Sequence, residues 1–72
     1  MEMSPEITIT LNGSPHTLAG PVPLSQLLES LGLDGKPVVV ELNEKAVFPR
    51  DYSQTGVDAG ARVEVVMLAA GG

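Results

Sequence analysis

Few side chains in this sequence could take part in catalysis. His16 is the only histidine and cysteine is absent, which excludes a thiolate nucleophile, a cysteine-based zinc site and a histidine cluster that holds a metal. Ser25, Ser30 and Ser53 lack a base partner that would activate them as nucleophiles. The carboxylates are scattered and do not form the converging pair that acid–base catalysis requires: Glu41, Glu44, Asp51, Asp58 and Glu64. The sequence therefore indicates a protein that is not an enzyme.

The end of the sequence offers a different kind of chemistry. The chain stops at Gly71-Gly72, directly after a strongly apolar segment. Because glycine has no Cβ, such a tail can pass through a narrow active-site channel and adopt backbone angles that other residues avoid. A terminal carboxylate is ionised at neutral pH and is a poor electrophile, but adenylation by ATP would turn it into an acyl donor. The plain alternative is a frayed chain end without a function.

Length and charge limit the remaining classes of function. The 72 residues form one small domain, 1–72, for which we expect a flexible C-terminal tail over 69–72. A net charge of −5 and two aromatic residues, Phe48 and Tyr52, disfavour nucleic acid and anionic membranes as partners. The longest apolar run, 65–70, is too short to cross a bilayer, and the first residues do not resemble a signal peptide. We therefore expect a soluble, cytoplasmic domain with no metal and no bound cofactor.

The first half of the chain predicts a hairpin and a helix. Residues 6–12 alternate apolar and polar side chains, as a strand with one buried face does. Asn12-Gly13 predicts a type I′ turn, with positive φ at both central residues, into a weaker edge strand over 15–19. Four leucines at helical spacing then predict a helix with Pro23 at its first position and Gly32 just beyond its end: Leu24, Leu27, Leu28 and Leu31.

The second half predicts three further strands. Residues 38–42 form an apolar, β-branched run, interrupted only by Glu41, that is typical of an interior strand; residues 46–48 form a short strand, and residues 62–68 the last strand. Residues 50–53 are expected to be irregular or a single helical turn. One helix packed across a face of a mixed five-stranded sheet is an α+β arrangement. The expected core is Ile7, Ile9, Leu11, Leu24, Leu27, Leu28, Leu31, Val38, Val40, Val63 and Val65.

Taken together, these residues resemble the ThiS-type sulfur carrier proteins of thiamine biosynthesis, which have the ubiquitin-like β-grasp fold. The resemblance covers nearly the whole chain. Its most specific parts are 41–43 (Glu-Leu-Asn), 49–50 (Pro-Arg) and the terminal Gly71-Gly72. The chain departs from the family in three places: Tyr52 stands where tryptophan is usual, Ala61 follows Gly60 where Gly-Asp is usual, and Ala70 replaces a common third glycine.

The resemblance implies a carrier on which other enzymes act. In the family the last glycine, here Gly72, is adenylated by an ATP-using adenylyltransferase that resembles ubiquitin-activating enzymes (ThiF-like). Sulfur from a persulfide donor then replaces AMP and leaves a thiocarboxylate, which gives up its sulfur in a thiazole synthase (ThiG-like). Ala70, Gly71 and Gly72 would pass into the partner's active site, and ATP would be bound by the partner alone.

Two alternatives remain open from the sequence. The chain could be the small subunit of molybdopterin synthase or another β-grasp sulfur donor, although Pro49-Arg50 after a Glu-Leu-Asn strand favours the thiazole pathway. It could also be a non-catalytic ubiquitin-like binding module or protein modifier, whose tail is incidental or joined to other proteins by an isopeptide bond.

A partner surface is expected on the last predicted strand. Alternation places Val63, Val65 and Met67 on one face, which leaves Val66 and Leu68 on the other, together with charged side chains. Apolar side chains on a solvent face beside a functional chain end are better explained as a docking patch than as core. We therefore predict that Val66 and Leu68 contact the partner.

Overall fold

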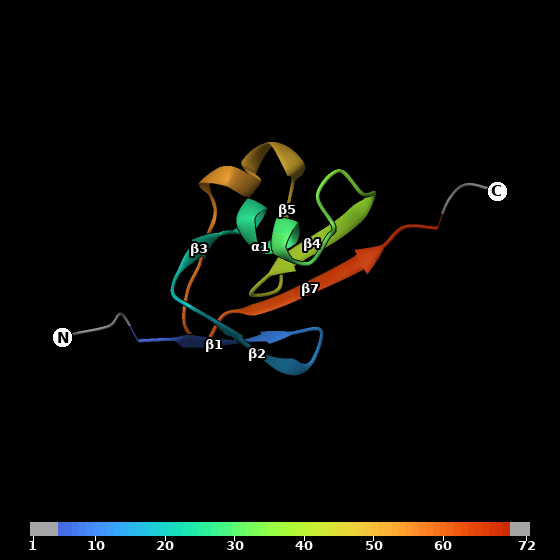
Figure 1. Cartoon of the computed structure of the whole chain (residues 1–72). Helices are drawn as coiled ribbons and strands as arrows, with labels where there is room; N and C mark the ends of the chain where they lie inside the picture. The colour runs from blue at the N-terminus through green and yellow to red at the C-terminus, as the bar shows by residue number, and fades with distance from the viewer. Residues whose placement is uncertain (1–4, 70–72) are drawn as a thin grey trace.

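The computed structural model describes residues 5–69, which form a five-stranded mixed sheet with one α-helix against one face (Figure 1). The strand order is β2-β1-β7-β4-β5, in which β1 and β7 are parallel and the other neighbours are antiparallel. The strands are β1 (Ile7–Leu11), β2 (Ser14–Leu18), β4 (Val38–Leu42), β5 (Lys45–Val47) and β7 (Arg62–Met67). The predicted α+β architecture is thus confirmed, with the last strand at the centre of the sheet and the second strand at an edge.

Two tight turns set the register of the two hairpins. Asn12 and Gly13 have φ values of 49° and 83°, which confirms the predicted type I′ turn. Asn43 and Glu44 join β4 to β5 with φ values of 52° and 70°. Asparagine tolerates this left-handed conformation better than most residues. Both turns therefore begin with an asparagine for a conformational reason.

The helix α1 (Leu24–Ser30) begins one residue later than predicted. Pro23 has φ −64° and ψ 149°, so it precedes the helix as an extended N-cap residue, and its assignment to the first helical position was wrong. The reason is a second, two-stranded sheet that the sequence pattern did not reveal. In it, β3 (Val22–Pro23) pairs with β6 (Gly56–Val57), and the Leu24 N–H donates to the Thr55 carbonyl at 2.7 Å.

The predicted end of the helix is confirmed. Gly32 follows the C-cap with φ 74°, and its N–H donates to the Glu29 carbonyl at 3.0 Å. The Leu33 N–H donates to the Leu28 carbonyl at 2.8 Å, which completes a Schellman motif. The motif turns the chain from α1 into the loop that leads to β4.

The core lies between α1 and the sheet. Most of the predicted core is buried, and Leu11, Leu31, Val38 and Val65 are half-buried around it. The prediction omitted Val57 and Ala61, because neither belongs to an alternating or helical pattern. The residues buried in the structure are Ile7, Ile9, Leu24, Leu27, Leu28, Val40, Val57, Ala61 and Val63.

We expect Leu27→Ala to lower the free energy of unfolding by about 2–5 kcal/mol, because it leaves a cavity in the closed core. Leu27 is 1% exposed. Leu31→Ala is the matched control, since Leu31 is only half-buried and its truncation should cost less than half as much. Urea unfolding of both variants measures the difference, and equal costs would mean that the buried face of α1 is misassigned.

The two turn asparagines hold the central strand from opposite sides. The Asn12 N–H donates to the Val63 carbonyl at 2.9 Å, and the Asn12 Oδ1 accepts from the Val65 N–H at 2.8 Å. The Asn43 N–H donates to the Arg62 carbonyl at 2.7 Å, and the Asn43 Oδ1 accepts from the Arg62 N–H at 2.9 Å. These bonds continue the β-ladders past the ends of β1 and β4, and so fix the start of β7.

Asn43→Ala should therefore destabilise the protein by about 1–3 kcal/mol, because it loses the side-chain acceptor and places alanine at positive φ. Asn43→Gly should cost less, because it also loses the side-chain acceptor but glycine adopts the positive φ angle without strain. Glu44→Ala is the control: Glu44 lies in the same turn at positive φ but holds β7 only through an exposed ion pair with Arg62. Urea unfolding should rank the losses as Asn43→Ala, then Asn43→Gly, then Glu44→Ala. A Glu44→Ala loss as large as that of Asn43→Ala would contradict this role.

Candidate functional site

The sheet face that points away from α1 carries an exposed apolar patch. Val39 of β4 lies directly opposite Val66 of β7, and their exposed fractions are 45% and 59%. Leu68 lies two residues beyond Val66 on the same face, and its N–H donates to the Pro37 carbonyl at 2.8 Å, which extends the ladder. The predicted exposure of Val66 and Leu68 is confirmed, and β4 adds Val39 beside them.

Phe48 extends this patch toward the edge of the sheet. Val47 pairs with the buried Val40, so strand alternation places the next residue, Phe48, on the opposite face, one position beyond the last β4–β5 pair. The Phe48 ring is exposed, and the Arg50 guanidinium lies 5.5 Å from the ring centroid. We call the four exposed apolar residues of this face the outer patch: Val39, Phe48, Val66 and Leu68.

An acidic pair borders the outer patch. Glu41 lies directly opposite Glu64 in the next cross-strand row, on the same face as Val39 and Val66. Like charges directly opposite each other on one face destabilise a sheet. Among residues 5–69 the ion pairs are Arg62–Glu44 and Arg50–Asp51, so no basic side chain there neutralises Glu41 or Glu64. A partner with basic side chains next to an apolar surface would complement this face.

The outer patch lies where the chain leaves the sheet. β7 ends at Met67, and Leu68 and Ala69 follow it as exposed residues. The predicted tail residues Ala70, Gly71 and Gly72 lie outside the described residues, as does all of the expected tail 69–72 except Ala69. A protein that covers the outer patch is therefore next to the start of the tail.

Val39 and Phe48 were not predicted as part of this surface. Residues 38–42 were interpreted as an apolar run interrupted only by Glu41, whereas strict alternation within that run separates exposed Val39 from half-buried Val38 and buried Val40. Phe48 is a large side chain at the point where a short strand meets Pro49, which was the available signal. Both residues lie near Val66 only because of the way in which the strands pair, and a sequence pattern within one strand does not show that pairing.

The described residues contain few other candidates. Between residues 5 and 69 there is no group of three His, Cys, Asp or Glu side chains that could hold a metal ion. No helix in this part of the chain is long and apolar enough to cross a membrane. His16 is half-buried in β2, opposite Ile9, and takes no part in the outer patch.

Comparison with known proteins identifies similar chains. The ThiS family model matches residues 9–72. The sulfur carrier protein ThiS of Thermus thermophilus is 39% identical over 64 residues, which cover 89% of this chain and 98% of that protein. A thiazole synthase of Paramagnetospirillum magneticum is 31% identical over 64 residues, which cover 89% of this chain but only 20% of that protein. The crystal structure of the thiamine biosynthesis protein ThiS from Geobacter metallireducens superposes with a TM-score of 0.80 at 30% identity, and covers 92% of this chain and 100% of that one.

Proposed function

From the premise that this chain belongs to the ThiS family and is a sulfur carrier of thiamine biosynthesis, we propose that Gly72 is the residue that carries the sulfur. The observation that supports this is the position of the outer patch, at the end of β7 from which the tail leaves. Four residues after Leu68 reach about 14 Å, which is enough to place the Gly72 carboxylate in the active site of a protein bound to the patch. ATP is then bound by that protein and not by the carrier.

The proposed chemistry exchanges an oxygen of the Gly72 carboxylate for sulfur in three steps. The carboxylate attacks the α-phosphorus of ATP, and pyrophosphate leaves. The terminal sulfur of a persulfide on a donor protein then attacks the acyl carbon, and AMP leaves. A thiol then attacks the donor protein's sulfur in the remaining S–S bond; a disulfide forms between that thiol and the donor, and the thiocarboxylate leaves. The sulfur is more nucleophilic than the oxygen that it replaces, so the thiocarboxylate can act as a sulfur donor.

We propose two enzyme partners for these steps: a ubiquitin-activating-type adenylyltransferase (ThiF-like) that forms the acyl adenylate, and a thiazole synthase (ThiG-like) that receives the sulfur. The second partner is supported by the Paramagnetospirillum magneticum thiazole synthase, in which a segment similar to this chain makes up 20% of the protein. Glu41 and Glu64, which form no ion pair within residues 5–69, favour partners with basic side chains around an apolar contact. Because the first step needs ATP, we place the protein in the cytoplasm.

The test is conversion of the purified protein by an adenylyltransferase, ATP and a persulfide donor. We expect a gain of about 16 mass units as sulfur replaces oxygen, a covalent change that the sequence does not record. The product should then react with iodoacetamide, because a thiocarboxylate, like a thiolate, is an ionised sulfur nucleophile. No cysteine competes for the reagent. Fragmentation in the mass spectrometer should place the alkyl group on Gly72.

Methionine oxidation is the necessary control. Oxidation of Met1, Met3 or Met67 to the sulfoxide adds nearly the same mass, but the product does not react with iodoacetamide as a thiocarboxylate does. A sample incubated without ATP should show neither the alkylation nor the Gly72 label. If the added mass maps to a methionine, or alkylation does not depend on ATP, Gly72 is not the sulfur carrier.

A further inference from the structure

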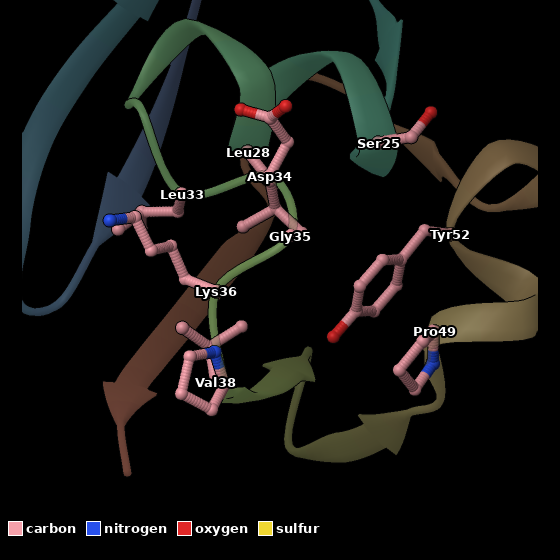
Figure 2. Close-up of a pocket in the computed structure, with 10 residues that line it drawn as sticks. Ser25, Leu28, Leu33, Asp34, Gly35, Lys36, Val38, Pro49 and Tyr52 are labelled. Carbon is pink, nitrogen blue, oxygen red and sulfur yellow. The ribbon is translucent and has the colours of Figure 1, made fainter. Parts of the chain in front are cut away.

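A second surface feature lies on the helix side of the sheet, the face opposite to that of the outer patch. It is a cavity of about 360 Å³ between α1, the loop that precedes β4, and the 3-10 helix η1 (Pro49–Gln54) (Figure 2). Its walls are mostly apolar and include Leu28, Leu33, Val38 and Pro49. Tyr52 leans from η1 into the cavity with its hydroxyl facing inward (Figure 2).

The cavity exists because β5 ends before it has covered the length of β4. The β4–β5 ladder stops at the pair Val40–Val47, although β4 begins two residues earlier, at Val38. Pro49 has no N–H to donate to a ladder, and it turns the chain away from the sheet into η1. The space that a longer β5 would occupy is therefore open beside Val38.

The backbone of Val38 faces this space. The Pro37 carbonyl accepts from Leu68, and the Asn43 N–H donates to Arg62, so odd-numbered residues of this segment direct their polar backbone groups toward β7. Val38 and Val40 consequently direct theirs to the other side. Val40 meets β5 there, but within residues 5–69 no hydrogen bond joins the Val38 backbone to a neighbour on that side. A donor and an acceptor thus point toward the open edge of β4, at the residue that also lines the cavity.

We propose that this cavity binds an extended peptide segment of a protein partner, which adds a short strand beside Val38 and inserts one apolar side chain. A residue opposite Val38 in an antiparallel pair would exchange two backbone hydrogen bonds with it. Its side chain would lie on the same sheet face as the Val38 side chain, which is the helix side. Leu28, Leu33 and Tyr52 form the walls at that position.

The chemistry of the site favours a peptide over a purely apolar occupant. An apolar molecule would leave the Val38 N–H and C=O buried without partners, which costs about 1–3 kcal/mol for each group. The Tyr52 hydroxyl makes no hydrogen bond within residues 5–69 and can donate to a peptide carbonyl. One extended residue with its flanking peptide groups supplies partners for all three.

The cavity is also close to the strand end that precedes the tail. Pro37, which lines it, holds Leu68 through the 2.8 Å hydrogen bond, so a protein that contacts the start of the tail has this site within reach. The identity of the partner as an enzyme that acts on the tail rests on the proposed function. Peptide binding itself does not depend on the proposed function, and it is measured without ATP, sulfur or any enzyme.

The test uses the capped tripeptide acetyl-Thr-Leu-Thr-amide, titrated into the ¹⁵N-labelled full chain and followed by amide NMR shifts. We expect saturable shifts centred on Gly35, Lys36 and Val38. Replacing the leucine by alanine should weaken binding at least about tenfold, because less apolar surface is buried. N-methylation of the leucine removes the donor for the Val38 carbonyl and should weaken binding by about the same factor. Equal binding of the three peptides would overturn the proposal, as would shifts centred on Val39 and Val66.

Two variants locate the site independently of the peptide. Ser25→Leu places a larger side chain in the cavity and should abolish the shifts, whereas Gln26→Leu makes the same kind of change at an exposed neighbour in α1 and should not. Tyr52→Phe keeps the ring and should weaken binding severalfold through loss of the hydroxyl. Wild-type affinity in both Ser25→Leu and Tyr52→Phe would refute the cavity as the binding site. That result would leave the proposed role of Gly72 intact, because ATP-dependent alkylation is a separate measurement.

Discussion

Gly71→Val should leave the stability of the protein unchanged and lower the rate of ATP-dependent activation at least about a hundredfold. Valine adds a β-branched side chain next to the reacting carboxylate and excludes backbone angles that glycine can adopt. A displacement of about 1 Å of a reacting group is enough to cost a factor of this size. Release of pyrophosphate from ATP by the adenylyltransferase measures the activation step directly, and thermal unfolding measures stability.

Gly20→Val is the matched control for this variant. Gly20 lies far from the tail in the sequence, and a Cβ added there meets no atom within 4 Å. Gly20→Val should therefore be activated like the natural chain. One residue added after Gly72 tests the same mechanism in another way, because it moves the terminal carboxylate by about 3.5 Å. Wild-type pyrophosphate release from either tail variant would exclude Gly72 as the activated residue.

Local chemistry made much of the fold predictable from the sequence. Asn12-Gly13 specifies its turn because both residues adopt positive φ, and Gly32 ends α1 for the same reason. The four spaced leucines predicted the helix and its buried face. These features depend on neighbours in the sequence, so a pattern over a few residues reports them.

The features that escaped prediction depend on partners distant in the sequence. The bridge between β3 and β6 contains two residues on each side, too few to show a period, and it moved the start of α1 from Pro23 to Leu24. Val57 is buried because that bridge holds it against the core. The strand alternation of β4 was masked by valine at three successive positions, 38–40, which look alike in sequence but lie on different faces.

The outer patch illustrates the same limit at the site. Alternation in the last strand was sufficient to predict the exposed side chains of Val66 and Leu68. It gave no information about Val39 and Phe48, which reach the patch through the β4–β7 and β4–β5 registers. The cavity beside Val38 was equally hidden, because it results from the departure of η1 at Pro49 from the edge of the sheet. Single residues were predictable, and the surfaces that they form together were not.

Val66→Asp should lower kcat/KM for activation by the adenylyltransferase at least about a hundredfold while the protein stays folded. Val66 lies beside Val39 in the outer patch and is 59% exposed, so an aspartate there remains hydrated in the free protein. In the complex the same carboxylate would be buried against an apolar surface without a partner, which costs several kcal/mol. The loss should appear mainly in KM, since the tail and its carboxylate are unchanged.

Thr17→Asp separates this local effect from the change in net charge. Thr17 is an exposed residue of the edge strand β2 and lies opposite Thr8, on the sheet face that carries the outer patch. The substitution therefore adds the same negative charge to this face, but two strands away from β7 and Val66. Thr17→Asp should be activated within about twofold of the natural chain, because an isolated surface charge contributes little. If both variants lose activation equally, the carrier's net charge governs the encounter. If neither loses it, the adenylyltransferase does not bind the outer patch, and the exposure of Val66 needs another explanation.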